Sequence, residues 1–173
     1  MAEKAFIIID MLNDFVREQG ALYVGEAGRR IIPAIARELA KAREEGWPVI
    51  YVCDQHQQED REFEMFPPHC LAGSKGGEVC TELAPRTGDL VVYKRRYSGF
   101  YGTDLDLCLR ERGIQELVLT GVCTNICVLY TAADARMRGY GVTVLKECVA
   151  SFDERAHDFA LQEMKKTLGA KVI

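Results

Sequence analysis

A chain of 173 residues is long enough to bury one hydrophobic core without disulfides, so we expect a single domain over residues 1–173. Its formal net charge of -4 comes from interspersed acidic and basic residues, which argues against the basic face that nucleic acid binding requires. The seven cysteines are odd in number and follow no secreted-framework spacing, and no apolar run reaches the length of a membrane helix. We therefore expect a cytoplasmic protein without a membrane partner.

Six short, β-branched apolar runs predict strands. In chain order they lie at 5–9, 48–53, 90–93, 116–120, 142–145 and 171–173. The runs are continuously apolar rather than alternating, which is typical of strands that are buried on both faces. This pattern favours a parallel sheet.

Helical patterns fill most of the intervals between these runs, at 28–45, 103–112, 125–138 and 153–168. Each pattern is followed by a glycine, the residue that most readily adopts the left-handed conformation past a helix end: Gly46, Gly113, Gly139 and Gly169. The alternation predicts a three-layer α/β/α fold with a mostly parallel sheet of about six strands. Residues 54–88 break the alternation, and so long a loop in a compact domain is usually functional.

Polar side chains follow the predicted strands, at the edge of the sheet where ligands bind in such folds. Asp10 follows the first strand, Asp54 and His56 follow the second, and Lys94 follows the third. The segment from Gly121 to Cys127 follows the fourth. Each of these groups has an ordinary structural explanation, such as a cap or a solvated amine. Their convergence on one edge favours a catalytic site.

Cys127 is predicted to lie in the first turn of the helix after "GVCT", with Thr124 as the N-cap. Unpaired amides, the helix dipole and a nearby lysine lower a thiol pKa, so we expect a thiolate nucleophile there. The amides of Cys123 and Cys127 would stabilise a developing oxyanion. The alternative is that cysteines in apolar runs simply fill the core. We keep that interpretation for four others: Cys53, Cys80, Cys108 and Cys148.

The irregular segment also carries a metal-binding pattern. Asp54 and His56 form a "D-x-H" pair on one side of an extended chain, and His69 can supply a third ligand. Three protein ligands would leave open positions for water. A single loop histidine is more often a structural hydrogen-bonding residue, but two histidines with an aspartate indicate a metal site.

Four motifs appear in the order in which one known family carries them. They are "FIIIDMLNDF" (6–15), "DQH" with "FPPHCLAGSKG" (66–76), "YKRRYSGFYGTDLD" (93–106) and "GVCTNICVLYTAADA" (121–135). With these motifs the sequence resembles the isochorismatase-like cysteine hydrolases, and within them the nicotinamidases, over nearly its whole length. The resemblance implies hydrolysis of nicotinamide to nicotinate and ammonia through a cysteine thioester, as in NAD salvage.

The resemblance also implies roles for individual residues. Asp10, Lys94 and Cys127 match the catalytic triad, the amides of Cys123 and Cys127 match the oxyanion hole, and the peptide bond before Cys123 is expected to be cis. The position of Cys123 commonly holds a small residue such as alanine in the family. Its thiol is therefore interpreted as a bystander.

A second set of roles concerns the metal and the substrate. The resemblance implies one divalent ion on Asp54, His56 and His69, with zinc preferred and iron or manganese compatible. Some nicotinamidases add a carboxylate between the two histidines, and either Glu62 or Glu64 would serve here, with Glu62 preferred. An aromatic slot that holds the pyridine ring is expected from three residues: Phe15, Phe66 and Tyr97.

Other functions remain open from the sequence. A related cysteine amidase acting on an N-carbamoyl compound or another small amide would use the same triad. Isochorismate hydrolysis proper is disfavoured because that chemistry does not use the cysteine. A thiol redox sensor or binding module would use Cys123 and Cys127 as an i, i+4 pair, but it leaves Asp10, Lys94 and both histidines unexplained. The oligomeric state is open, with a homo-oligomer compatible.

Overall fold

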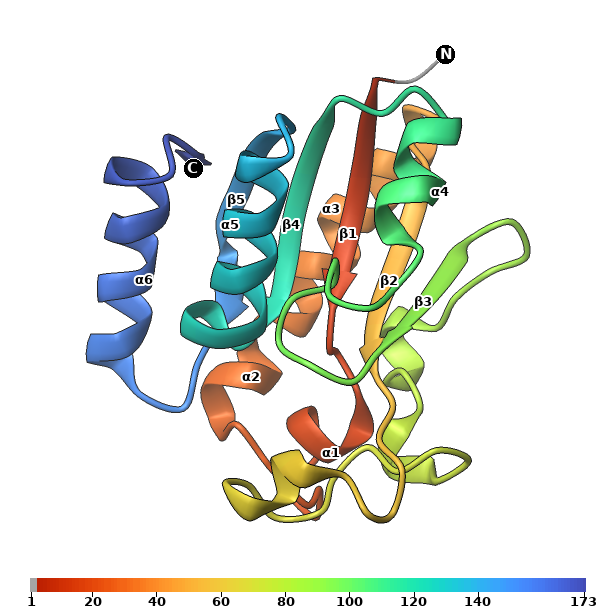
Figure 1. Ribbon diagram of the computed structural model, residues 1–173, viewed down its shortest axis with the longest axis vertical. Coiled ribbons are helices and arrows are strands. Elements are labelled where there is room, and N and C mark those ends of the chain that lie inside the picture. The colour runs from red at the N-terminus through yellow and green to blue at the C-terminus, as the bar shows by residue number, and fades with distance from the viewer. Residues whose placement is uncertain (1–2) are drawn as a thin grey trace.

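A six-stranded parallel sheet forms the centre of the computed structural model, which describes residues 3–173 (Figure 1). The strands lie in the order β3-β2-β1-β4-β5-β6, and every neighbouring pair is parallel. Their bounds are β1 Lys4–Ile9, β2 Val49–Asp54, β3 Leu90–Lys94, β4 Glu116–Val122, β5 Gly141–Ala150 and β6 Lys171–Val172. All six predicted strands are confirmed.

Helices cover both faces of the sheet. Their bounds are α1 Asn13–Val16, α2 Glu26–Arg30, α3 Ile32–Glu44, α4 Leu105–Glu111, α5 Leu129–Met137 and α6 Glu154–Lys166. Successive residues of β1 face opposite sides: Phe6 and Ile8 pack in the core with α3, whereas Ile7 and Ile9 pack in the core with α4 and α5. These two cores on either side of one sheet confirm the three-layer α/β/α fold.

The predicted helix over 28–45 is wrong in one respect, because the structure divides it into α2 and α3 at Ile31. Pro33 lies at the start of α3. Proline lacks the backbone N–H and its ring clashes with the carbonyl four residues earlier, so the helix cannot run through it unbroken. The apolar face predicted for this helix is nonetheless buried, at Ile31, Ile35, Leu39 and Ala42.

The irregular segment after β2 lies beyond the carboxyl ends of β1 and β2, beside α1 (Figure 1). It contains three short 3-10 helices, η1 Arg61–Glu64, η2 Lys75–Gly77 and η3 Thr81–Leu83. Isolated bridges tie His56 to Leu71 and Leu12 to Val79. The segment is thus folded back over the edge of the sheet that carries the candidate site.

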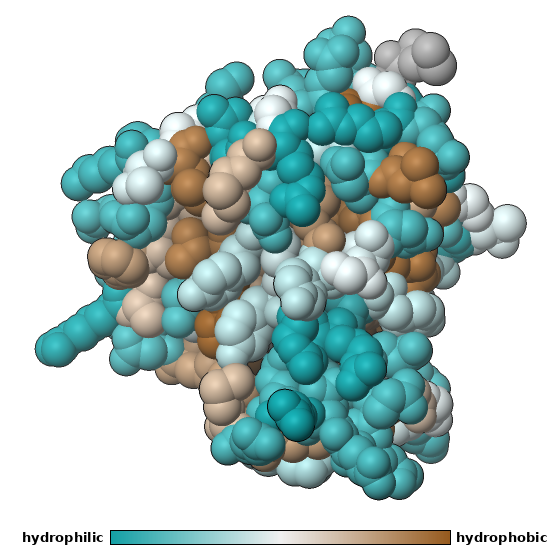
Figure 2. All heavy atoms as spheres, in the orientation of Figure 1, coloured by the Kyte–Doolittle hydropathy of each residue, from teal (hydrophilic) through white to brown (hydrophobic). Residues whose placement is uncertain are grey.

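The face seen in Figure 2 is largely hydrophilic, with hydrophobic side chains interspersed among polar ones. Within residues 3–173, none of the helices combines the length and the apolar character needed to cross a membrane.

Gly121 pairs with Ile9 where β4 runs beside β1. Its φ is +111°, and a Cβ built there would lie 1.9 Å from the carbonyl oxygen of Ile9. Such a contact is with backbone, which cannot move aside as a flexible side chain would. Only glycine therefore allows β4 to deliver the following residues to the site.

We expect Gly121→Ala to lower the free energy of unfolding by more than about 4 kcal/mol, because the methyl group meets strand backbone. Gly113→Ala is the matched control, since Gly113 has a positive φ of +66° but nothing lies within 4 Å of the added Cβ. That variant should lose only about 1 to 2 kcal/mol from the left-handed conformation. Urea unfolding of both variants measures the difference, and equal losses would show that the close strand contact is unimportant.

Candidate active site

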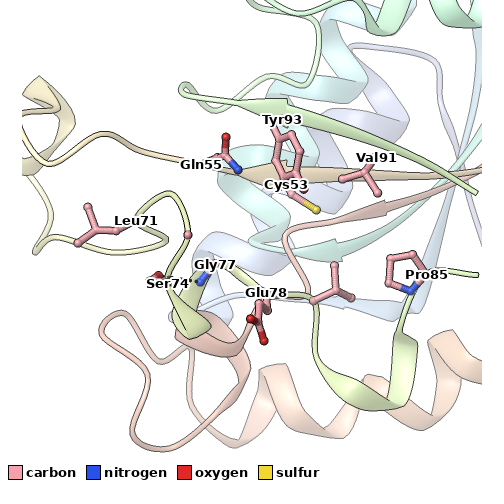
Figure 3. Close-up of a pocket in the computed structure, with 11 residues that line it drawn as sticks. Cys53, Gln55, Leu71, Ser74, Gly77, Glu78, Pro85, Val91 and Tyr93 are labelled. Atoms are coloured by element: carbon pink, nitrogen blue, oxygen red, sulfur yellow. Dashed lines mark hydrogen bonds between the residues drawn. The ribbon is translucent and has the colours of Figure 1, made fainter.

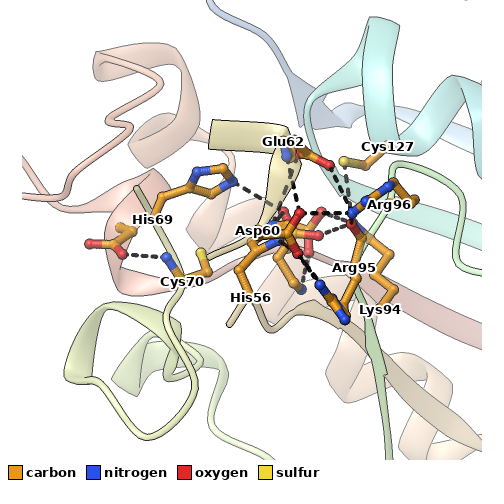
Figure 4. Close-up of polar contacts among 12 residues, drawn as sticks. His56, Asp60, Glu62, His69, Cys70, Lys94, Arg95, Arg96 and Cys127 are labelled. Carbon is orange, nitrogen blue, oxygen red and sulfur yellow. Dashed lines mark hydrogen bonds and ion pairs between the residues drawn. The ribbon is translucent and has the colours of Figure 1, made fainter. Parts of the chain in front are cut away.

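The ammonium of Lys94 lies at the centre of the candidate site, at the end of β3 (Figure 4). Its Nζ is 2.9 Å from Asp10 Oδ2 and 3.5 Å from Cys127 Sγ, and it donates a short hydrogen bond to Asp54 Oδ1. All four residues are buried. The structure therefore brings together the three residues predicted as a triad and joins them to one predicted metal ligand.

Three adjacent parallel strands position these groups. Lys94 and Asp54 are register partners at the ends of β3 and β2, and Asp10 directly follows the neighbouring β1. At Asp10 the backbone turns with a φ of +52°, and its Oδ1 accepts a 2.7 Å hydrogen bond from the Asp54 amide. A positive φ at a residue other than glycine is strained and must be held by its surroundings. That hydrogen bond aims the carboxylate at Lys94.

Cys127 lies in a π-helical turn, Thr124–Val128, between β4 and α5. The peptide bond between Val122 and Cys123 is cis, as expected. The predicted N-cap is wrong: Cys123 occupies that position, and Thr124 is already in the turn, with Oγ1 2.7 Å from His157 Nδ1. The amides of Ile126 and Val128 both donate a hydrogen bond to the Cys123 carbonyl, whereas the Cys127 amide between them does not. The oxyanion role of the Cys123 and Cys127 amides stays a prediction.

The protonation states differ from the sequence-based expectation. Burial raises the pKa of the Cys127 thiol well above its ordinary value, although Lys94 acts in the opposite direction. Burial, together with the charge of Asp54, raises the pKa of Asp10 to about 6. The prediction of a lowered thiol pKa is therefore wrong. The thiol holds its proton at rest, beside a carboxylate that is a stronger base than usual.

A second buried cluster contains the predicted metal ligands. Asp54, His56, Glu62 and His69 each offer a ligand atom, and these atoms all lie within 4.8 Å of one another. Asp54 Oδ2 is 3.5 Å from His56 Nε2 and 3.6 Å from His69 Nε2, and His56 Nε2 is 3.9 Å from Glu62 Oε1. Glu64 is exposed, so of the two glutamates considered from the sequence only Glu62 joins the cluster.

The positions of the histidine ring protons in this cluster leave lone pairs that could bind a cation. His69 Nδ1 contacts the Pro67 carbonyl at 2.8 Å, an oxygen that only accepts hydrogen bonds, so this nitrogen carries a proton and, in the neutral ring, Nε2 presents a lone pair. His56 Nε2 and Glu62 Oε2 are buried without a hydrogen-bond partner. In the neutral ring, a lone pair on His56 Nε2 faces Asp54 Oδ2 at 3.5 Å and Glu62 Oε1 at 3.9 Å, which is unfavourable unless a positive charge lies between them.

The charges of the site support the same conclusion. When ionised, the buried carboxylates of Asp10, Asp54 and Glu62 bring three negative charges, against the single positive charge of Lys94. One divalent cation would balance the remainder. Ligands bound at about 2.1 Å around a tetrahedral metal lie about 3.4 Å apart, close to the separations from Asp54 to both histidines. The donor set of imidazole and carboxylate therefore fits a metal ion such as zinc, iron or manganese.

Asp60 contacts this cluster through His56, and the sequence analysis missed it. Its carboxylate is buried, and Oδ2 lies 3.1 Å from His56 Nδ1. Arg95 and Arg96, which directly follow Lys94, also bind it. The acidic residue four positions after His56 and the arginine pair were visible in the sequence, but Glu59, Glu62 and Glu64 lie beside Asp60 and nothing distinguishes it from them.

An apolar slot opens onto Cys127. The three aromatic residues expected there, Phe15, Phe66 and Tyr97, all line it, and Phe66 meets the rings of His69 and Tyr97 edge-on at 6.3 and 6.5 Å. The remaining lining residues are Leu22, Asp54, Glu62, His69, Val122, Cys123, Ile126, Cys127 and Phe152. No lysine or arginine of the described chain is among them. The contact of the aromatic residues with substrate stays a prediction.

A separate hollow lies beside the edge strand β3, between Cys53, Val91 and Tyr93 on the sheet and the loop that includes Ser74 and Glu78 (Figure 3). It is more spacious than the slot but contains none of Asp10, Lys94 or Cys127. The narrower slot is therefore the candidate substrate site.

Comparison with known proteins agrees with this geometry. A family model described as the isochorismatase domain matches residues 4–173. The crystal structure of nicotinamidase PncA from Bacillus subtilis has 41% sequence identity and a TM-score of 0.94, with 99% of each chain covered. N-carbamoylsarcosine amidase from Thermoplasma acidophilum has 36% identity and a TM-score of 0.89, over 99% of this chain and 95% of that one. Pyrazinamidase of Pyrococcus horikoshii in complex with zinc has 32% identity and a TM-score of 0.92, with 99% of each chain covered.

We expect the metal-free protein to take up one zinc ion per chain, and His69→Ala to lose that uptake because it removes one of two imidazole ligands. His157→Ala is the matched control, since His157 is the third histidine of the chain and lies outside the cluster. Elemental analysis after dialysis against zinc measures both. Equal zinc content in His69→Ala and in the wild type would refute the site.

Proposed function

The chain belongs to the isochorismatase family, and we propose that it is a nicotinamidase, which hydrolyses nicotinamide to nicotinate and ammonia. It is a nicotinamidase-like amidohydrolase, an enzyme that cleaves C–N bonds. The observation that carries the proposal is the slot itself. An apolar, aromatic cavity is lined both by the buried Cys127 and by three of the proposed metal ligands, Asp54, Glu62 and His69.

The composition of the slot favours a flat, neutral amide. Aromatic side chains such as Phe15 and Phe66 supply faces and edges against which a ring packs. A substrate that carries its own carboxylate would need a cation beside it, whereas the acidic side chains Asp54 and Glu62 line the slot and no lysine or arginine of the described residues does. The slot is narrow, so its lining side chains must move apart when substrate enters.

In the first half of the reaction, Asp10 takes the proton from the Cys127 thiol. Its raised pKa makes it a suitable base near neutral pH. The sulfur attacks the carboxamide carbon, and the amides of Cys123 and Cys127 donate to the resulting oxyanion. Asp10 then gives its proton to the leaving nitrogen, so ammonia departs and Cys127 carries the acyl group as a thioester.

In the second half, a water molecule loses a proton to Asp10 and attacks the thioester. Asp10 returns this proton to the sulfur of Cys127, so the carboxylic acid leaves and the thiol is restored. Lys94 stays charged throughout, because Asp10 and Asp54 outweigh the effect of burial and raise its pKa well above the ordinary value. A divalent metal held by Asp54, His56, His69 and Glu62 would supply a Lewis-acidic anchor for the pyridine nitrogen. The product nicotinate would enter NAD salvage.

Two other functions are tested by the same experiments. An N-carbamoyl amidase would use the same triad, and the similarity to N-carbamoylsarcosine amidase supports it as an alternative. A thiol sensor would depend equally on Cys123 and Cys127. Burial raises the pKa of Cys123 to about 12, and Lys94 donates a hydrogen bond to the Cys127 thiol and not to that of Cys123, so the two cysteines are not equivalent, which argues against that function.

We expect Cys127→Ala to abolish ammonia release from nicotinamide, because it removes the nucleophile. Cys123→Ala should retain most of the turnover, since the substitution leaves the backbone amide in place. Asp10→Asn should lose about 10²-fold or more, the usual contribution of a general base. Initial rates of ammonia release check all three, with circular dichroism to confirm folding. Similar losses in both cysteine variants would contradict the assignment of the nucleophile.

The substrate is tested by an ammonia-release screen across nicotinamide, pyrazinamide and N-carbamoylsarcosine. We expect the two neutral ring carboxamides to be hydrolysed with the higher kcat/KM, because no lysine or arginine of the described residues lines the slot to bind a carboxylate. A preference for the carbamoyl compound would overturn the nicotinamidase proposal and leave the cysteine amidase chemistry standing.

A further inference from the structure

Asp60 begins the 3-10 helix η1 and is the most heavily hydrogen-bonded carboxylate near the proposed metal site. Oδ1 accepts from the Glu62 amide and from Arg96 Nη1, both at 3.0 Å. Oδ2 accepts from Arg95 Nε at 2.9 Å and lies 3.1 Å from His56 Nδ1. The side chain has no exposed surface. Each oxygen therefore has two partners of its own, and together these occupy the acceptor sites of the carboxylate.

This arrangement decides which nitrogen of His56 carries the proton. A carboxylate paired with two guanidinium groups has no proton to donate, so the contact with His56 requires Nδ1 to be the donor. In the neutral ring Nε2 then presents its lone pair, and this is the buried atom left without a hydrogen-bond partner. Nε2 faces Asp54 Oδ2 and Glu62 Oε1.

The two histidines of the cluster are held differently. His69 Nδ1 binds the carbonyl of Pro67, a backbone group two residues away. His56 depends instead on a side chain from another turn of the loop, and that side chain depends on the segment after β3. Lys94, Arg95 and Arg96 are consecutive, so one strand end binds both Asp54 and Asp60.

We propose that Asp60 is a positioning residue, which fixes the tautomer and the ring orientation of His56, and that Arg95 and Arg96 hold Asp60 for this purpose. The inference rests on the proposed metal site and goes beyond its ligands. Partners of this kind orient metal-binding imidazoles, and their loss typically weakens metal affinity about 10- to 100-fold. It also accounts for the "YKRR" charge cluster, whose two arginines are about half exposed yet point to a buried carboxylate.

The first test is zinc affinity, measured by competition with a chelator on the metal-free protein. Asp60→Asn should bind zinc about 10- to 100-fold more weakly than the wild type. Asp89→Asn is the matched control: Asp89 is also a largely buried carboxylate bound to an arginine, at 2.6 Å from Arg43, but it lies outside the ligand cluster. It should bind zinc as the wild type does. Wild-type affinity in Asp60→Asn would overturn the inference.

The second test does not need the metal. Nitrogen NMR of the histidine rings in metal-free protein, at a pH where the rings are neutral, should show His56 with the proton on Nδ1 in the wild type. Asp60→Asn should show a mixture that includes the Nε2–H form, because an amide can donate as well as accept. An unchanged Nδ1–H tautomer in the variant would overturn the role of Asp60, whatever the zinc affinity.

If Asp60→Asn does not fold, a double substitution, Arg95→Gln with Arg96→Gln, tests the same contact from the solvent side. It should weaken zinc binding while thermal unfolding confirms a folded protein, and unchanged affinity would overturn the inference. The wild-type titration separates the two claims. A wild type without zinc affinity refutes the proposed metal site and the inference with it, whereas zinc binding that is insensitive to these substitutions refutes the inference alone.

Discussion

The buried ammonium of Lys94 is the interaction on which the whole site depends. Asp10 and Asp54 are both completely enclosed, and two carboxylates that close together would not both stay ionised without a cation between them. Burial alone would raise the pKa of Asp54, but Lys94 and the histidines lower it below its ordinary range. Lys94 therefore sets the charge state of the base and of a proposed metal ligand at once.

Asp54 links the two halves of the site. Its Oδ1 binds Lys94 while its Oδ2 faces His56 and His69, so the triad and the ligand cluster share one side chain. Removing either partner would leave a buried charge uncompensated, which is costly in a protein interior. The acylation chemistry at Cys127 and the proposed metal site are thus parts of a single charge network.

Much of this arrangement could be predicted from the sequence because it follows from strand ends. Continuous apolar runs predicted the parallel strands, and parallel strands place Asp10, Asp54 and Lys94 on one edge. The features that were missed have two kinds of cause. Pro33, which is visible in the sequence, ends α2 at Ile31, whereas the π-helical turn at Cys127 and the role of Asp60 depend on contacts between distant segments. The thiol pKa was predicted in the wrong direction because the effect of burial exceeds that of a helix terminus and one lysine.

The most direct test of the central claim is intact-mass analysis of the wild-type enzyme, quenched in acid during turnover of nicotinamide, followed by peptide mapping. The claim is that Cys127, beside Asp10 and Lys94, carries the acyl group of the substrate. A nicotinoyl adduct on the peptide that contains Cys127, formed and lost at rates compatible with ammonia release, is the expected result. Ammonia release with an adduct on Cys123 instead, or with none at any quench time under conditions where a thioester would accumulate, would contradict it.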